Sequence, residues 1–196
     1  YIVISNHKFS GHFEAWAKTK PYKITVVDDG TETNEKRLGA VRDIQYAIDK
    51  LSLDDDMLVI AGDNVLDFSL TRFISYSKQK KTSCIMRYYE PSEEKLLKSG
   101  VVTIDDKDLV LDMTEKPPTP ATNWCCPPFY FYTRKDAGLV KKAIEAGCGT
   151  DAPGSFIAWL CKEKKVHAME MPGRRYDIGS LTDYEKIQNE YRGIIG

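Results

Sequence analysis

The fold is decided by Met57-Leu58-Val59-Ile60-Ala61-Gly62-Asp63-Asn64, an apolar run that ends in a glycine and a carboxylate. Four consecutive apolar residues are typical of a strand that is buried on both faces of a sheet. Ligands of open α/β sheets collect beyond the carboxyl ends of such strands, and Asp63 stands at that point. Its carboxylate could bind a hard divalent cation, and Gly62 would let a nucleotide approach the backbone closely. The alternative is that Asp63 caps the next turn or helix.

Segments on either side of this strand alternate between strand-like and helical patterns. The residues in 39–51 place apolar side chains three and four positions apart, which indicates an amphipathic helix. Short apolar runs ended by turn residues, such as Asp28-Asp29-Gly30, indicate strands. The expected strands are 1–5, 23–27, 57–60 and 83–88, and the expected helices are 12–18, 39–51 and 68–77. This alternation predicts parallel strands with helices on both faces.

The second half of the chain changes this rhythm. Strand-like runs at 101–104 and 109–113 have no helix between them, and the polar residues 105–108 indicate a hairpin. The remaining expected elements are a strand at 124–132, helices at 137–146 and 155–162, a strand at 166–171 and a helix from Thr182. We therefore expect a Rossmann-like three-layer α/β/α fold with a mixed, mostly parallel sheet. Residues 1–196 are enough for a single domain.

Composition excludes several classes of protein. The formal net charge of −1 argues against a nucleic-acid binder, which normally shows a basic face. We find no apolar run of roughly 18 residues and no secretory leader, so we expect no membrane span and no signal peptide. The cysteines are odd in number, five, and none forms a C-x-x-C pair. Reduced thiols in a cytoplasmic protein are the expected state, and Cys125 and Cys126 are expected to pack within a strand.

Two further segments place charged side chains where chemistry is possible. Asp177 stands between Tyr176 and Ile178, and a carboxylate flanked by apolar residues is costly unless it is paired or binds a cation. An ion pair with Arg174 or Arg175 is the structural alternative. Glu115-Lys116-Pro117 follows an expected strand. There the glutamate could accept hydrogen bonds from hydroxyl groups and the lysine could offset phosphate charge, although an ordinary exposed loop pair is the interpretation normally favoured.

Two glycine-containing segments begin expected helices. Leu38-Gly39-Ala40 enters the helix at 39–51, where a base or phosphate could approach free N–H groups, or where the glycine could simply cap the helix. Residues 151–156 read as a helix start.

Taken in order, these segments resemble the sugar nucleotidyltransferase family, typified by glucose-1-phosphate thymidylyl- and uridylyltransferases. The resemblance covers nearly the whole chain, and the combination is specific although no single piece is. Its motifs are Ser5-Asn6-His7-Lys8-Phe9, Leu38-Gly39-Ala40, Ile60-Ala61-Gly62-Asp63-Asn64, Gly100-Val101-Val102, Glu115-Lys116-Pro117, Asn123 with Phe129-Tyr130-Phe131-Tyr132, and Gly173-Arg174-Arg175-Tyr176-Asp177-Ile178-Gly179.

The resemblance implies a reaction in which a sugar 1-phosphate attacks the α-phosphate of dTTP, UTP or CTP, giving a nucleotide-sugar and pyrophosphate. It implies that Mg²⁺ binds Asp63 and Asp177, and that Lys116 joins them as a catalytic residue. It also implies that Leu38, Gly39 and Gly62 bind the nucleotide, and that Gly100, Glu115, Lys116 and Asn123 bind the sugar phosphate. The protein's work in such a reaction is positioning and charge neutralisation. A homo-oligomer is left open.

The sequence departs from the family in three places. The family's glycine-rich loop with an arginine, followed by Lys-Pro, does not occur in residues 1–196, where the only Gly-x-Gly is Gly147-Cys148-Gly149. We therefore expect that a strand-loop-helix unit is missing and that the chain as given is inactive or nearly so. Pro127-Pro128 stands where better-known members have a glycine-containing segment, and Tyr176 where many carry tryptophan.

Two other functions stay open at this point. A family-A glycosyltransferase would need Asp-x-Asp at a strand end, whereas Asp54-Asp55-Asp56 precedes its strand. A non-catalytic regulatory domain that binds a nucleotide-sugar is the second. The sugar and the base are open too, and a non-sugar phosphate such as phosphocholine fits the same pattern.

Overall fold

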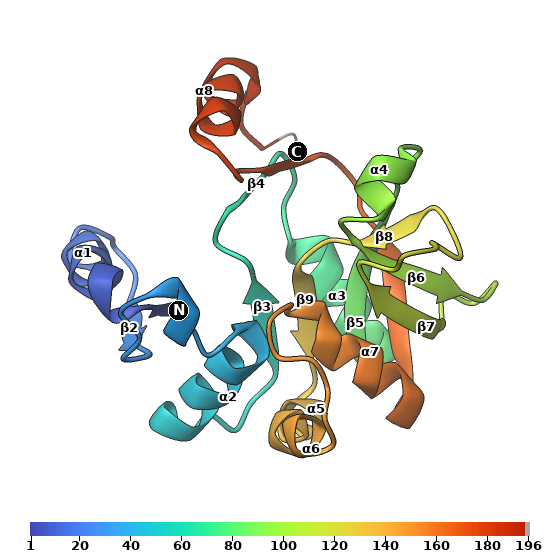
Figure 1. Cartoon of the computed structure of the whole chain (residues 1–196), viewed down its shortest axis with the longest axis horizontal. Coiled ribbons are helices and arrows are strands. Elements are labelled where there is room, and N and C mark those ends of the chain that lie inside the picture. The colour runs from blue at the N-terminus through green and yellow to red at the C-terminus, as the bar shows by residue number, and fades with distance from the viewer. Residues whose placement is uncertain (195–196) are drawn as a thin grey trace.

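A central sheet of seven strands organises the computed structural model, which describes residues 1–194 (Figure 1). Its hydrogen-bonded order is β3 (Met57–Ile60), β9 (Phe129–Tyr132), β5 (Ser83–Tyr89), β8 (Trp124–Cys126), β6 (Gly100–Ile104) and β7 (Val110–Glu115), and β10 (Val166–Glu170) also pairs with β5. Two smaller sheets accompany it. One joins β1 (Ile2–Ser5) to β2 (Thr25–Asp28), and the other joins β4 (Asn64–Leu66) to β11 (Arg175–Asp177).

The expectation of a mostly parallel sheet is wrong. Within residues 1–194, only the pairs β1–β2 and β5–β10 are parallel. The other pairings are antiparallel, because β9 enters between β3 and β5, β6 and β7 form a hairpin, and β8 enters between β5 and β6. The alternation of strands and helices predicts most of the longer elements, but it cannot reveal that a later strand inserts between two earlier ones.

Helices cover both faces of this sheet, as the three-layer prediction requires. Ile85 of β5 packs in a core with α2 (Ala40–Leu51), α6 (Val140–Glu145) and α7 (Gly154–Glu163). Its neighbours Cys84 and Met86 point the other way, into a second core with α3 (Thr71–Lys80). This alternation follows from the two-residue period of a strand.

The expected boundaries move where a cap or a proline intervenes. The helix expected at 12–18 is α1 (His7–Ala17), which starts earlier because the Asn6 side chain accepts a hydrogen bond from the Phe9 amide at 3.1 Å. The strand expected at 124–132 divides into β8 and β9 at Pro127-Pro128. The remaining helices are the 3₁₀ turn η1 (Asn34–Lys36), α4 (Glu93–Leu96), α5 (Arg134–Ala137) and α8 (Leu181–Glu190).

The strand that opened the sequence argument lies at an edge of the sheet. β3 pairs with β9 alone among the described residues, and Ile60 at its end is 43% exposed. Met57, Leu58 and Val59 are half-buried, so the expected burial on both faces is only partly met. The β1–β2 pair lies to one side of the main sheet, beside α1 (Figure 1).

Candidate functional site

A cavity of about 860 Å³ opens at the end of the sheet where β6, β7 and β8 meet the loop before α7. Segments from β11 and α8 form its other wall. Four of the residues predicted for the site line it together: Gly100, Glu115, Lys116 and Asp177. They come from three elements and one loop, so the fold brings residues 77 positions apart into one space.

Two glycines make room for the Glu115 carboxylate. A Cβ on Gly154 would lie 1.9 Å from Glu115 Oε1, and a Cβ on Gly100 would lie 3.3 Å from the same oxygen. Burial raises the pKa of the Glu115 carboxyl, while the Lys116 ammonium and the Gly154 backbone N–H act in the opposite direction. A half-hidden carboxyl beside bare backbone is well placed to bind hydroxyl groups of a small polar ligand.

The backbone holds Lys116 in an unusual conformation. Its φ of 47° lies in the left-handed region, which residues other than glycine rarely adopt. The Lys116 N–H donates to the Ser99 carbonyl at 2.9 Å, which ties this turn to the start of β6. Strain of this kind persists only where the surroundings impose it, and here it places a cation beside Glu115 at the cavity.

A polar chain joins the two carboxylates predicted to bind metal. Asn64 Nδ2 donates to Asp63 Oδ1 at 2.6 Å, and Asn64 Oδ1 accepts from Arg175 Nη1 at 2.7 Å. The same Nη1 donates to Asp177 Oδ1 at 3.1 Å. The ion pair offered by the sequence as the structural alternative for Asp177 is therefore present, with Arg175 rather than Arg174.

Asp63 and Asp177 could each offer carboxylate oxygens to a magnesium ion, but only Asp177 lines the cavity and the two do not make a cage. Asn64 and Asp177 are partners in the β4–β11 ladder. The Ile178 N–H donates to the Asp63 carbonyl at 2.8 Å, so Asp63 and Asp177 occupy neighbouring positions on opposite strands at the end of this ladder. Residues 1–194 contain no cluster of three or more His, Cys, Asp or Glu side chains that could hold a metal. Mg²⁺ commonly binds one or two carboxylates together with waters and substrate phosphates.

The two glycines predicted to bind the nucleotide occupy different settings. The first N–H groups of α2 are already used, because Ala40 donates to the Asp151 carbonyl at 3.3 Å and Val41 to the Thr150 carbonyl at 3.0 Å. Gly39 has φ of 92°, and a Cβ there would lie 2.5 Å from the Thr150 oxygen. Leu38 precedes this contact and is half-buried. Gly62 is different, since nothing lies within 4 Å of where its Cβ would be.

Asn123 does not line the cavity. Its Nδ2 donates to the Glu90 carbonyl at 2.9 Å, and the Glu90 N–H donates to the Asn123 carbonyl at 2.8 Å. This closed pair fastens the chain leaving β5 to the chain entering β8. Glu90 itself lines the cavity and is buried, a position that sequence reasoning missed because no local pattern marks it.

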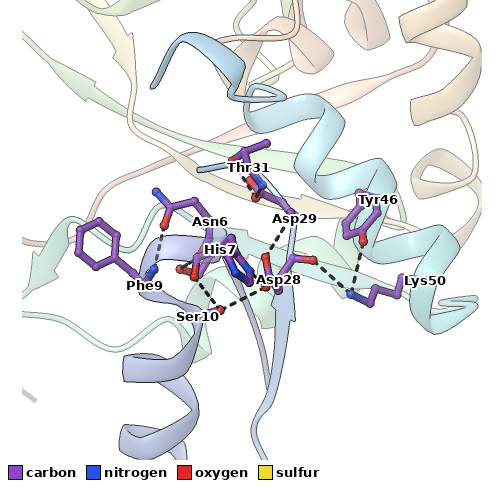
Figure 2. Close-up of polar contacts among 11 residues, drawn as sticks. Asn6, His7, Phe9, Ser10, Asp28, Asp29, Thr31, Tyr46 and Lys50 are labelled. Carbon is purple, nitrogen blue, oxygen red and sulfur yellow. Dashed lines mark hydrogen bonds and ion pairs between the residues drawn. The ribbon is translucent and has the colours of Figure 1, made fainter. Parts of the chain in front are cut away.

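A second polar cluster stands at the carboxyl ends of β1 and β2 (Figure 2). Asp28 Oδ2 contacts His7 Nδ1 at 2.6 Å and accepts from Ser10 Oγ at 3.3 Å, while its Oδ1 accepts from the Gly30 N–H at 2.8 Å. This bonding raises the pKa of His7 and lowers the pKa of Asp28. The sequence marked a turn at 28–30 and a family-like segment at 5–9, but the pairing of His7 with Asp28 across 21 positions gave no local signal.

The acidic run before β3 is engaged elsewhere. Arg134 forms an ion pair with Asp54, and its backbone N–H donates to Asp56 Oδ1 at 2.8 Å. These aspartates tie the start of α5 to the loop before β3, at the amino end of that strand. They do not line the cavity.

The cysteines have a structural setting. Cys84, Cys125 and Cys126 are buried, and burial raises the pKa of each thiol. All five cysteines are free. In a separate observation, no helix of the described chain is long and apolar enough to cross a membrane.

Fold and cavity together define an α/β protein with carboxylates and cations gathered around a space large enough for a phosphorylated polyhydroxyl ligand. The chain belongs to the nucleotidyl transferase family, whose family model matches residues 1–193. The match spans all the elements described above.

Individual relatives are distant. The bifunctional protein GlmU of Methanocaldococcus jannaschii is 27% identical over 151 residues, which are 73% of this chain and 35% of the relative. The glucose-1-phosphate adenylyltransferase of Lachnospira eligens is 24% identical over 144 residues, 71% of this chain and 33% of the relative. The chain thus spans about a third of the length of these curated relatives.

Solved structures show the same fold. A UDP-glucose pyrophosphorylase complexed with UDP-glucose superposes with a TM-score of 0.74 at 18% identity, covering 96% of this chain and 73% of the other. The UDP-glucose pyrophosphorylase from Acinetobacter baumanii gives a TM-score of 0.68 at 21% identity, covering 92% and 64%.

Proposed function

We propose that the chain is the acceptor-binding part of a sugar-1-phosphate nucleotidyltransferase. In this reaction a phosphate oxygen of the sugar 1-phosphate attacks the α-phosphorus of a nucleoside triphosphate, and pyrophosphate leaves. The observation that carries the proposal is the meeting of Gly100, Glu115, Lys116 and Asp177 around one cavity. Family membership and the pyrophosphorylase-like fold support it.

Each residue has a role that its setting favours. Glu115, set against the bare backbone of Gly100 and Gly154, accepts hydrogen bonds from sugar hydroxyls. Lys116 lies beside it at the cavity and offsets the charge of the sugar phosphate as a point cation. Asn123 acts indirectly, because its amide holds the Glu90 segment of the cavity wall in place.

Asp63 and Asp177 are the residues that would hold Mg²⁺. A bound ion supplies charge neutralisation to the phosphate oxygens. Gly62, with open space around it, is the better placed of the two candidate glycines for a nucleotide. Leu38 stays a candidate for contact with the base. Gly39 serves the packing of α2 onto the Thr150-Asp151 loop, so we propose no direct contact for it.

The two alternatives have less support. The aspartates needed for a glycosyltransferase-like Asp-x-Asp site pair with Arg134, away from the cavity. A regulatory domain that binds a nucleotide-sugar without turnover would use the same cavity. Residues 1–196 hold no glycine-rich loop with an arginine, so we expect this chain alone to bind such ligands with little or no pyrophosphorolysis.

Calorimetric titration of the 196-residue chain tests the proposal. UDP-glucose, dTDP-glucose, ADP-glucose, GDP-mannose and CDP-choline are added in turn, with and without Mg²⁺. We expect at least one to bind, and Lys116→Gln to weaken that binding about tenfold or more through the lost charge pair. Lys142→Gln is the control, since Lys142 lies on α6 over the Trp159 ring. Absence of binding by the whole panel would refute the proposal.

Substitution of the carboxylates tests the metal assignment separately. Asp63→Asn and Asp177→Asn should each abolish the Mg²⁺-dependent part of nucleotide-sugar binding, because a neutral amide is a poor ligand for a hard cation. The same titrations measure this. Unchanged Mg²⁺ dependence in both variants would rule out the assignment while leaving the sugar-phosphate site standing.

A further inference from the structure

One guanidinium lines the cavity beside Asp177, the carboxylate proposed to bind the metal. Arg175 is the first residue of β11, and its side chain is only 19% exposed. It lines the cavity together with Lys116 and Asp177. Its position opposite Leu66 in the ladder puts it on the same strand face as Asp177, two residues on. In Figure 1, β4 rises out of the main sheet to meet this segment.

The contacts of Arg175 use one nitrogen for two partners. Nη1 donates to Asn64 Oδ1 at 2.7 Å and to Asp177 Oδ1 at 3.1 Å. Asn64 in turn donates to Asp63 Oδ1 at 2.6 Å. The Tyr88 ring supports the guanidinium from the side, with its centroid 5.7 Å from Cζ. Arg175 therefore contacts Asp177 directly and is linked to Asp63 through Asn64.

A cation bound to Asp177 would compete with the Arg175–Asp177 ion pair. A divalent ion placed on Asp177 Oδ1 would stand next to Nη1 and repel the guanidinium. The freed side chain would remain within the cavity, where a planar fork of donors suits a phosphate group. Lys116 approaches the same space as a point charge.

We propose that Arg175 neutralises Asp177 while no cation is bound, and that a divalent cation displaces it so that the guanidinium binds the phosphate of the acceptor. Arg175 thus couples cation binding to binding of an anionic acceptor. The proposal rests on the proposed metal role of Asp177. Because such coupling is reciprocal, phosphate must tighten cation binding by the factor by which the cation tightens phosphate binding.

Mn²⁺ affinity, measured by the loss of the free-ion electron paramagnetic resonance signal, tests the exchange without any turnover. We expect Arg175→Gln to bind Mn²⁺ about 3- to 10-fold more tightly than the unchanged chain, since a competing partly buried ion pair is gone. Lys186→Gln is the matched control, because Lys186 is a second cation of the cavity wall. If both variants tighten binding equally, the effect is only the loss of positive charge, and the proposal is wrong.

The second part of the experiment repeats the Mn²⁺ titration in the presence of inorganic phosphate. In the unchanged chain it should tighten Mn²⁺ binding about threefold or more, and in Arg175→Gln this effect should disappear. Coupling that persists in the variant would mean that phosphate meets the ion without Arg175, which overturns the proposal.

Failure of the metal assignment is distinguishable from failure of the exchange. If Asp177→Asn leaves Mn²⁺ affinity unchanged, the proposed metal role of Asp177 is wrong and the exchange falls with it. If Asp177→Asn weakens Mn²⁺ binding but Arg175→Gln changes nothing, only the exchange is wrong.

A measurement on the unchanged chain covers the case in which the Arg175 variant does not fold. The Arg175 ¹⁵Nε resonance, assigned by through-bond correlation to the Arg175 backbone of the unchanged chain, should move when Mg²⁺ is added and move again with phosphate. An Arg175 resonance that does not respond to saturating Mg²⁺ would overturn the proposal.

Discussion

Asp43, in the first turn of α2, carries a charge that the fold opposes. Its Oδ1 is buried without a hydrogen-bond partner among the described residues. Burial, with the nearby Asp29 carboxylate, raises the pKa of Asp43 from 3.8 to about 6. Between these pH values the folded chain binds more protons than the unfolded chain, so stability falls as pH rises through this window and stays reduced above it.

Asp43→Asn should therefore stabilise the chain at neutral pH. The full shift would correspond to about 3 kcal/mol, and because the side chain is only half-buried we expect a gain of about 1 kcal/mol in the free energy of unfolding. Urea unfolding near neutral pH and at about pH 4 measures it, and the gain should vanish in acid. Asp49→Asn on the same helix is the control, because Asp49 is exposed. A gain that is equal at both pH values would contradict the account.

The His7–Asp28 pair makes a prediction with two pH limits. The pKa of His7 is raised, so the stability that its protonation contributes to the folded chain is complete below about pH 6.5 and is lost as pH rises through the raised value. The pKa of Asp28 is lowered, so the stability that its ionised carboxylate contributes is present above about pH 3.8 and is lost as pH falls through the lowered value. Imidazole NMR titration should show the His7 pKa return towards its ordinary value in Asp28→Asn. No change would rule out the pair.

At the scale of elements, two glycines fix how helices meet loops. Gly39→Ala should cost about 2 kcal/mol or more of the free energy of unfolding, because φ is 92° and the new Cβ would lie 2.5 Å from the Thr150 oxygen. Gly11→Ala in α1 is the control, where nothing lies within 4 Å and the helix should gain up to about 1 kcal/mol. Denaturant unfolding compares them, and equal effects would refute the assigned role of Gly39.

Gly154 sets the position of Glu115 at the start of α7. Gly154→Ala would force Glu115 Oε1 out of its place, so we expect nucleotide-sugar binding to weaken about tenfold or more while the fold survives. Gly138→Ala is the control, since its nearest atom lies at an ordinary 3.5 Å. Unchanged affinity in Gly154→Ala would show that the Glu115 carboxylate does not bind the ligand.

Elements with a strong local pattern could be predicted from the sequence, and elements defined by distant partners could not. The apolar steps of α2 and the consecutive apolar residues of β5 record burial on one face and on both faces, which a short sequence window reveals. β4 and β11 are three-residue strands whose polar link, Asn64 to Arg175, spans 111 positions. Likewise, Lys116 and Asp177 could be singled out as candidates, but their shared cavity depends on how β7 and β11 are placed by the whole fold.

At the scale of the whole molecule, the cavity joins three parts of the chain. β7 provides the Glu115 carboxylate, Gly100 of β6 and Gly154 at the start of α7 leave room for it, and β11 with α8 closes the far side. Tyr191 anchors the end of α8 by donating to the Leu66 carbonyl at 3.0 Å, which ties that wall to β4. The account therefore predicts that ligand binding changes the environment of residues in all three parts at once.

A glycine-selective ¹⁵N NMR titration tests this most directly, with each nucleotide-sugar of the panel added in the presence of Mg²⁺. The account predicts that at least one ligand shifts the Gly100 and Gly154 amides together, because these two amides flank Glu115, while Gly11 in α1 stays unmoved. If no ligand moves Gly100 and Gly154, or if the shifts are confined to the Gly11 and Gly30 region, the cavity is not the nucleotide-sugar site and the central claim is wrong.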